Sequence, residues 1–448
     1  MKSKFLSLAL GISLGLSSLT ANADDLTDIY RLALENDPQL LRAAAERDAA
    51  RSAIDVSRAE WYPQIDATAG YAYTFSDGTN YVAPPIGDEE NFVPRSSSSS
   101  SWNRGVSLSQ QVFNLRTWRA TEIVEKQAYQ QEVNYLLTRQ QLMLRVTDAY
   151  FDVLLAKDNL EFASAEKRAI ERQLDQTRQR FSVGLTAVTD VHEAQAQYDQ
   201  AAAREIQAQN AVEIAYEALR EITGRSHQNI HVLNTAMFEP VTPDPATPRE
   251  WVDLAQERNL ELLITRSSLE IADQRIELQR TGHYPTVGLS ASYGDRSSQD
   301  DRGQVGLSLN IPLFRGGGTI ASTEQARNEY VAVSQTLEEN RRAVERRVRS
   351  NYLDVVANIS TISALEQAVV SAESALNATQ AGFEVGTRTI VDVLDSTRNL
   401  FNARRNLSEA RYGYIQGILN LQQAAGTISE DALFAINDAL QPAATTTE

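Results

Sequence analysis

Two aspartates in the second half of the chain, Asp392 and Asp395, have the type and spacing of residues that interact with cations. Side chains three residues apart on a helix lie on one face, so the two carboxylates would point the same way. Acidic residues also occur just after turns for a simpler reason, because they complement the positive end of the helix dipole. Asp190 and Glu193 stand at the equivalent places in the first half of the chain, so both interpretations stay open from the residues alone.

The other residues that could take part in chemistry form incomplete patterns. His227 and His231 are four apart, but Gly224 precedes them and no carboxylate ligand accompanies them, so we expect no metal site. The glycines at 316–318 lack the Lys-Ser/Thr ending of a phosphate-binding loop and predict a flexible turn. The serine run 96–101 has no His/Asp partners and is predicted to be a surface loop. We therefore expect no enzyme activity, no metal and no cofactor.

Composition and the first residues bound the class of protein. The 448 residues include 42 Lys+Arg, 59 Asp+Glu and no cysteine, with a formal net charge of −17. Such acidity argues against nucleic acid as a partner, and the absence of cysteine excludes disulfides and thiolate chemistry. Residues 1–23 have a basic start, an apolar stretch and an Ala-Asn-Ala cleavage site, which predict a signal peptide for export. No later run is as uniformly apolar as a membrane-spanning helix.

The chain contains an internal duplication. An offset of 202 residues aligns Tyr150, Asp152 and Val153 with Tyr352, Asp354 and Val355. A proline-rich stretch that holds Pro240, Pro243, Pro245 and Pro248 separates the two halves. We predict a signal peptide (1–23), a first repeat (24–238), a linker (239–250), a second repeat (251–440) and a disordered tail (441–448).

Each repeat is predicted to hold a helix, two strands and a long helical hairpin. The first helix runs through 26–60, broken only at Pro38, and alternating apolar and polar residues predict strands at 65–75, 106–112, 287–293 and 305–313. The segments 115–183 and 319–381 contain no Gly or Pro. At ~1.5 Å per residue, each could form a helix on the order of 100 Å long. A Val-Gly pair ends each long helix, at 183–184 and 385–386, and a second helix returns.

Four amphipathic strands are too few to close a membrane barrel, which needs about eight. Either the sheet packs on a core of its own, or several chains each contribute four strands to one shared barrel. Strands near ten residues long suit a tilted outer-membrane strand, and faces of Gly, Ser and Thr suit a wet lumen. We favour the shared barrel. The alternative is a periplasmic coiled-coil spacer or adaptor without a membrane barrel.

The chain resembles the TolC family of outer-membrane efflux proteins over essentially all of its mature length. The resemblance rests on the Ala-Leu-Glu-Asn-Asp-Pro segment 33–38, the Tyr-Pro pairs at 62–63 and 284–285, the segment 305–317 and, most specifically, 385–395. It implies an α+β membrane protein: a homotrimer in which four strands per protomer form a twelve-stranded outer-membrane β-barrel, continued by a long periplasmic α-helical coiled-coil barrel.

The resemblance also implies a function and partners. It implies a passive exit duct for efflux of drugs and small molecules and for type I protein secretion. The duct would be embedded in outer-membrane lipid, extend into the periplasm, and dock on a periplasmic adaptor and an inner-membrane RND or ABC pump.

The resemblance assigns roles to individual residues at the hairpin tips. Asp392 and Asp395 align with the family's constriction aspartates and would form two rings of carboxylates in the trimer. Arg388 is expected to bond Thr189 and Asp190 on the neighbouring hairpin, which would hold the duct closed. Two further residues belong to this expectation: Gln173 would join the same network, and Phe383 replaces a tyrosine of some relatives and cannot supply its hydroxyl bond.

Overall fold

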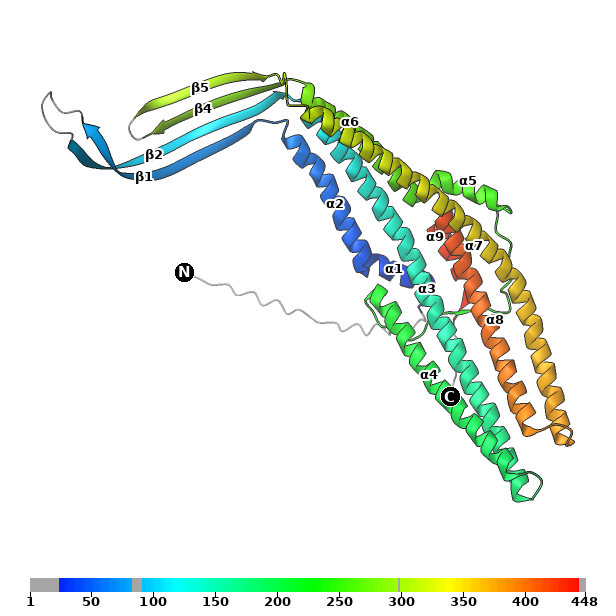
Figure 1. Cartoon of the computed structure of the whole chain (residues 1–448). Helices are drawn as coiled ribbons and strands as arrows, with labels where there is room; N and C mark the ends of the chain where they lie inside the picture. The colour runs from blue at the N-terminus through cyan, green and yellow to red at the C-terminus, as the bar shows by residue number, and fades with distance from the viewer. Residues whose placement is uncertain (1–23, 83–90, 297–298, 443–448) are drawn as a thin grey trace, which may run out of the picture.

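The computed structural model describes residues 24–82, 91–296 and 299–442. It is an elongated molecule with a four-stranded sheet at one end and long helices running away from it (Figure 1). The predicted signal peptide, 1–23, and the last residues of the predicted tail, 443–448, lie outside the described part.

The same order of elements occurs in both halves of the chain. The first half contains α1 (Leu26–Asn36), α2 (Pro38–Ala59), β1 (Gln64–Val82), β2 (Asn91–Phe113), α3 (Leu115–Ser182) and α4 (Val188–Thr223). The second half contains α5 (Pro248–Arg258), α6 (Leu260–Arg280), a 3-10 turn η1 (Thr281–His283), β4 (Thr286–Arg296), β5 (Gln299–Asn310), α7 (Gly318–Glu384) and α8 (Ile390–Ala425). Three short elements complete the fold: β3 (Val232–Leu233), α9 (Glu430–Asn437) and β6 (Leu440–Gln441).

The strands of the first half are longer than the sequence predicted. β1 has 19 residues and β2 has 23, whereas β4 and β5 have 11 and 12, close to the expected ten. The prediction of a surface loop for the serine run 96–101 is wrong, because these residues lie inside β2 and pair with β1, from Asp77 to Ala72. A neighbouring strand satisfies the backbone whatever the side chains are, so weak strand propensity was overridden.

The four strands form an open antiparallel sheet in the order β1-β2-β4-β5. Both outer strands, β1 and β5, have one unpaired edge in the described part of the chain. Large apolar side chains on these strands are exposed, among them Phe75 and Val305, at 78% each. An open sheet with exposed apolar side chains cannot be stable alone, so it requires further strands and an apolar surrounding.

The two long helices, α3 and α7, have 68 and 67 residues and end where the sequence predicted. Each is followed by a turn in which a glycine takes a left-handed conformation, with φ of 78° at Gly184 and 77° at Gly386. Residues with a side chain rarely adopt this conformation, so the Val-Gly pairs define both hairpin tips. The tips lie at the end of the molecule farthest from the sheet (Figure 1).

The main hydrophobic core lies halfway along the helices, where α1, α3, α4, α8 and α9 meet. Tyr150 and Phe151 of α3 are fully buried there, and the Tyr150 hydroxyl donates to the carbonyl of His231 at 2.8 Å. β6 pairs with β3 beside this core, so Gln441, predicted as the start of the tail, belongs to a strand.

Part of α7 is apolar enough, by length and composition, to qualify as a candidate membrane span, and only 11% of that part is buried within one chain. Polar residues interrupt this part of α7, so the sequence contains no continuous apolar run there and did not predict a span. Leu353 and Val370 are examples of exposed apolar side chains on α7. A helix that is apolar on several faces is typical of one with neighbours on several sides.

Candidate functional site

The candidate site lies at the hairpin tips, where a small apolar cluster holds the two hairpins together. Ile170 and Leu174 of α3 pack with Ile390 and Leu394 of α8. Ala194 and Ala201 of α4 complete the buried part of the cluster, and Phe383 packs against it. Alanines let helices approach closely, so the position of the tip of one hairpin is defined by the other.

Asp392 caps the helix on which it lies. The Thr389 backbone N–H donates to the Asp392 carboxylate at 2.8 Å, and the Asp392 N–H donates to the Thr389 hydroxyl at 3.3 Å, which is a complete capping box. The bonds that the Asp392 carboxylate accepts from the Thr389 N–H and the Thr389 hydroxyl, together with the charge of Arg388, hold the pKa of Asp392 below its usual range. Asp392 therefore acts as a helix-terminal acid, which is the simpler of the two interpretations that the sequence left open.

The equivalent helix start in the first repeat is built differently. Ala187 takes the N-cap position of α4 and has no side chain that caps the helix. Asp190 instead accepts a hydrogen bond from Thr186. Only the second repeat has the reciprocal cap, so the carboxylates of Asp190 and Asp392 are held by different groups.

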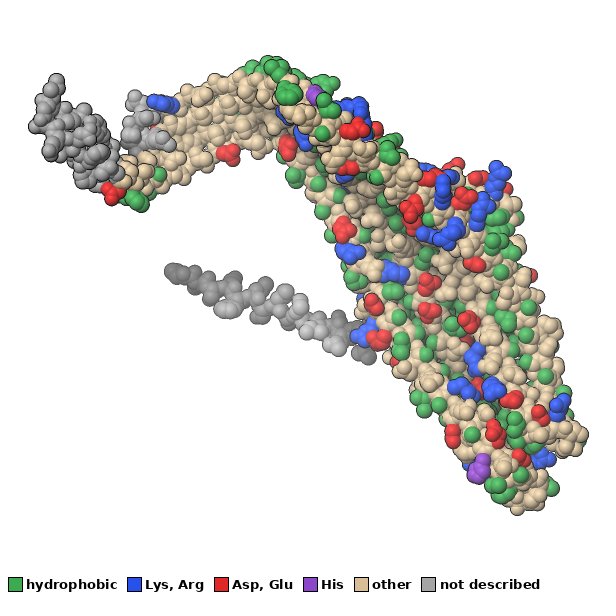
Figure 2. Space-filling model, in the orientation of Figure 1, with side chains coloured by type: hydrophobic (Ala, Val, Ile, Leu, Met, Phe, Trp, Pro, Cys, Tyr) green, Lys and Arg blue, Asp and Glu red, His purple; other side chains and the backbone are tan. Residues whose placement is uncertain are grey.

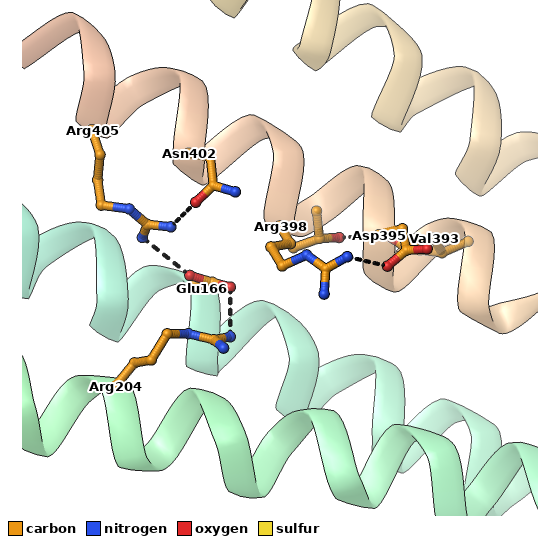
Figure 3. A network of polar contacts seen from close by, with 8 residues as sticks. Glu166, Arg204, Val393, Asp395, Arg398, Asn402 and Arg405 are labelled. Carbon is orange, nitrogen blue, oxygen red and sulfur yellow. Dashed lines mark hydrogen bonds and ion pairs between the residues drawn. The ribbon is translucent and has the colours of Figure 1, made fainter.

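Asp395 lies one turn further along α8 and is paired within its own helix. Arg398 donates to its carboxylate at 2.7 Å, and the Asp395 side chain is 49% exposed (Figure 3). Arg398 was not predicted as a partner of Asp395, although its spacing of three residues from Asp395 was a usable signal. A guanidinium at this distance offsets part of the negative charge that Asp395 presents.

The expected partners of Arg388 are not in contact with it within one chain. In the described residues, the exposed Arg388 side chain makes no hydrogen bond or ion pair with Thr189 or Asp190. The amide nitrogen of Gln173 is buried and has no acceptor among the described residues. The bond of Arg388 to a neighbouring hairpin stays a prediction.

Phe383 makes a contact that the sequence did not predict. The guanidinium of Arg180 lies 4.5 Å from the centre of the Phe383 ring, and Arg180 also donates to the Phe383 carbonyl at 3.4 Å. These contacts join the end of α3 to the end of α7. No periodicity or motif signalled this pair, because it depends on how the two hairpins pack.

A buried ion-pair network joins the hairpins further from the tips. The Glu166 side chain on α3 is only 1% exposed, and it accepts from Arg204 of α4 at 2.8 Å and from Arg405 of α8 at 3.2 Å (Figure 3). Arg405 also donates to Asn402. A buried carboxylate is tolerated only with such partners, so Glu166 connects three helices from both hairpins.

The histidines that we considered as metal ligands lie apart from the tips, beside the main core. The two ring nitrogens of His227 lie 2.7 Å from the Asp24 carboxylate and 2.9 Å from the Thr223 hydroxyl. In the described residues, no group of acidic residues and histidines could hold a metal ion. His227 thus connects the start of the described chain to the end of α4.

The site and fold together define a class of protein, a channel subunit that is completed by further copies. A family model described as Outer membrane efflux protein matches residues 29–225 and 251–427. The chain is 44% identical to Outer membrane protein TolC of Vibrio cholerae, over 98% of this chain and 99% of that protein. It is 30% identical to Alkaline protease secretion protein AprF of Pseudomonas aeruginosa, over 90% of this chain and 85% of that protein.

A solved structure of CusC, a protein that forms a transmembrane channel, superposes with a TM-score of 0.76 at 17% identity, over 90% of this chain and 92% of that one. The chain belongs to the outer membrane efflux protein family. The expected fold class is confirmed: an α+β membrane protein whose four strands per protomer form a shared barrel continued by long helices.

These findings also establish location and function at the level of the family. The protein lies in the outer membrane and extends into the periplasm, where it is an exit duct for efflux and type I secretion. The family members are channels. The alternative of a periplasmic spacer without a membrane barrel is not favoured.

Proposed function

We propose that this duct is a passive channel that is gated at the hairpin tips by Asp392 and Asp395. The observation that carries the proposal is their placement: both carboxylates lie on the first two turns of α8 and remain accessible to solvent. In a trimer, three copies of each would form two rings around the axis. Rings of carboxylates favour cations, repel anions and bind multivalent cations.

The first test is the conductance of the purified protein in planar bilayers. We expect a small conductance that prefers cations and is blocked by divalent cations from the periplasmic side. A protein that inserts but passes anions and cations equally would contradict the aspartate gate. A trimer that never conducts would contradict the proposed duct.

We further propose that closure depends on Arg388 bonding Thr189 and Asp190 of the neighbouring hairpin, with Gln173 in the same network. Two observations support this. The Arg388 side chain is exposed and makes no hydrogen bond or ion pair in the described part of the chain, and the Gln173 amide nitrogen is buried without an acceptor there. Unpaired polar groups of this kind favour contacts that only assembly supplies.

Replacing Arg388 with alanine is expected to raise the fraction of time that the channel is open. Each protomer would lose a charge-assisted bond, which contributes about 1.5–3 kcal/mol when both partners are ordered. Single-channel recording measures the open fraction directly. The matched control is Arg172→Ala on α3, whose guanidinium, within the described part of the chain, bonds only a backbone carbonyl of its own helix. Equal effects from both substitutions would contradict the latch.

The Phe383→Tyr substitution is expected to reduce opening, because the added hydroxyl can supply the bond that phenylalanine lacks. Phe383→Leu should act in the opposite direction, since it removes the ring beneath Arg180. An exposed cation–π contact contributes about 0.5–1 kcal/mol, so the change in open fraction should be a few-fold. Opening that is unchanged in both variants would show that this residue has no part in closure.

We propose that the trimer docks on a periplasmic adaptor and on an inner-membrane pump of the RND or ABC type. The similarity to AprF, a secretion protein by name, supports an ABC-type secretion partner in particular. Drugs, other small molecules and unfolded polypeptides would pass, and the duct itself would do no chemistry. Hydrolysis by the purified protein that a point change abolishes would contradict this last statement.

We retain the division into a first repeat at 24–238, a linker at 239–250 and a second repeat at 251–440 as a proposal. The repeated order of helix, strand pair and long hairpin supports it. Residues 1–23 are proposed to be removed on export, which would leave Asp24 as the first residue.

A further inference from the structure

The connection between the sheet and α7 exposes an unusual group of apolar side chains. Leu313 and Phe314, which follow β5, are 92% and 87% exposed, and Ile311 and Ile320 on either side are also exposed. Figure 2 shows hydrophobic side chains gathered where the sheet meets the helices. So much exposed apolar surface in one place is typical of a contact site.

Two basic side chains lie within this apolar group. Arg315 and His283 line one pocket together with Leu313, Phe314 and Thr319. Among the described residues, neither basic side chain has a hydrogen bond or an ion pair. The nearby Arg280 and Arg327, by contrast, are paired with Glu277 and Glu324 on their own helices. We call His283, Ile311, Leu313, Phe314, Arg315 and Ile320 the junction patch.

The place of the junction patch in the cell follows from the family. The strands span the outer membrane and the helices extend into the periplasm, so the end of β5 at Asn310 and the start of α7 at Gly318 mark the periplasmic boundary of the bilayer. Apolar and basic side chains that alternate at such a boundary are suited to acyl chains and to phosphates, respectively.

We propose that the junction patch binds a phospholipid of the periplasmic leaflet, with Arg315 and His283 on the headgroup phosphate and Leu313 and Phe314 among the acyl chains. Continuity with the membrane-spanning strands supports a lipid at this position. Charge supports it as well, because an exposed guanidinium that has no partner among the described residues can bind a phosphate through charge-assisted hydrogen bonds.

A second copy of the chain is the other candidate for this position. β5 is an edge strand, and closing a shared barrel would place the start of β1 of the next protomer beside it. Glu60 precedes that strand and has no side-chain partner among the described residues, so it is the acid that could meet Arg315. The experiment therefore includes Glu60.

The experiment counts lipids on the intact trimer. Purified trimer is titrated with phosphatidylglycerol, and retained lipids are counted by native mass spectrometry. We expect up to one tightly held lipid per protomer, and an affinity about tenfold lower in Arg315→Gln, as for the loss of one charge-assisted bond. His283→Gln and Phe314→Ser should weaken binding as well. Arg346→Gln, at an exposed arginine of α7 far from the patch, should leave it unchanged.

Three results would overturn the proposal. One is an equal loss of lipid in Arg315→Gln and Arg346→Gln, which would indicate that positive charge anywhere on the surface retains the lipid. Another is binding of inorganic phosphate alone as tightly as the lipid, which would indicate a phosphate site. The third is unchanged lipid binding in Arg315→Gln, with a loss of trimer stability equal to that in Glu60→Gln. That result would assign the patch to the next protomer.

A spin label gives an independent readout of depth. The chain has no cysteine, so Phe314→Cys provides a single attachment site. In trimers reconstituted into bilayers, the label is expected to collide more with oxygen, which dissolves in lipid, than with a water-soluble nickel chelate. The opposite order would overturn the proposal, because the patch would then lie in water.

Discussion

Replacing Asp392 and Asp395 by asparagine in all three protomers is expected to abolish the cation preference of the channel. Six carboxylates would be removed from a narrow passage, where the effective dielectric constant is low and each charge acts strongly on a passing ion. We expect the ratio of cation to anion permeability to fall towards one, and block by divalent cations to weaken about tenfold or more. Reversal potentials in salt gradients and blocker titrations measure the two quantities.

The structure determines which substitution tests the charge alone. Asp392 accepts the Thr389 N–H in the capping box, so alanine would remove both the charge and the cap. Asparagine keeps an acceptor oxygen at the same place. At position 395, asparagine also leaves Arg398 without its carboxylate, so the Asp395→Asn single variant should change selectivity more than Asp392→Asn.

The duplication supplies the matched control. Asp190→Asn combined with Glu193→Gln removes the equivalent acids of the first repeat. Loss of the proposed bond between Arg388 and Asp190 should raise the open fraction, but we expect the cation preference to persist. If this control lowers selectivity as much as the double variant at 392 and 395, the charge of the whole tip determines selectivity. A channel indifferent to both double variants would mean that the constriction lies elsewhere.

Replacing Glu166 by glutamine is expected to loosen the two hairpins from each other. The guanidiniums of Arg204 and Arg405 would lose a buried carboxylate. Breaking a buried ion pair in this way destabilises the fold by about 3 kcal/mol, the lower end of the usual range. We expect the lower end because both arginines are partly exposed. Backbone amides of α3 and α8 near the network should then exchange hydrogen about 100-fold faster. Hydrogen exchange read by mass spectrometry on the trimer measures this.

Glu338→Gln is the matched control for the Glu166 substitution. Glu338 also accepts from two arginines, Arg341 and Arg342, but all three lie on α7 and are accessible to solvent. Its bonds join no separate elements, so we expect little change in exchange. Equal acceleration in the two variants would show that the Glu166 network does not hold the hairpins. A more frequent open state in Glu166→Gln alone would connect the network to gating.

Periodic features of the chain could be predicted closely. The breaks at Pro38 and at the two Val-Gly pairs, the ends of the long helices and β4 lie close to where the sequence placed them, whereas β5, predicted at 305–313, spans Gln299–Asn310. Each depends on neighbours within a few residues: on proline's lack of an N–H, on glycine's left-handed conformation, or on a repeat of two or of about 3.6 residues.

The contacts that give the tips their properties were less predictable. Arg180 lies against Phe383, and Glu166 meets Arg405 of a helix more than two hundred residues away. Both contacts depend on which faces of the two hairpins meet, and a side chain's type does not reveal its burial. The serine run 96–101 was misassigned for a related reason, because its strand is specified by pairing with β1 and not by its own residues.

The sequence by itself determined the elements, the duplication and the aspartates at a hairpin tip, because periodicity, glycine turns and local spacing are properties of short segments. Only the tertiary structure decided that Glu166 is buried between two arginines and that Arg180 lies against the Phe383 ring. Those properties arise when helices from different parts of the chain pack and exclude water, and the resulting free energies depend on distance and burial.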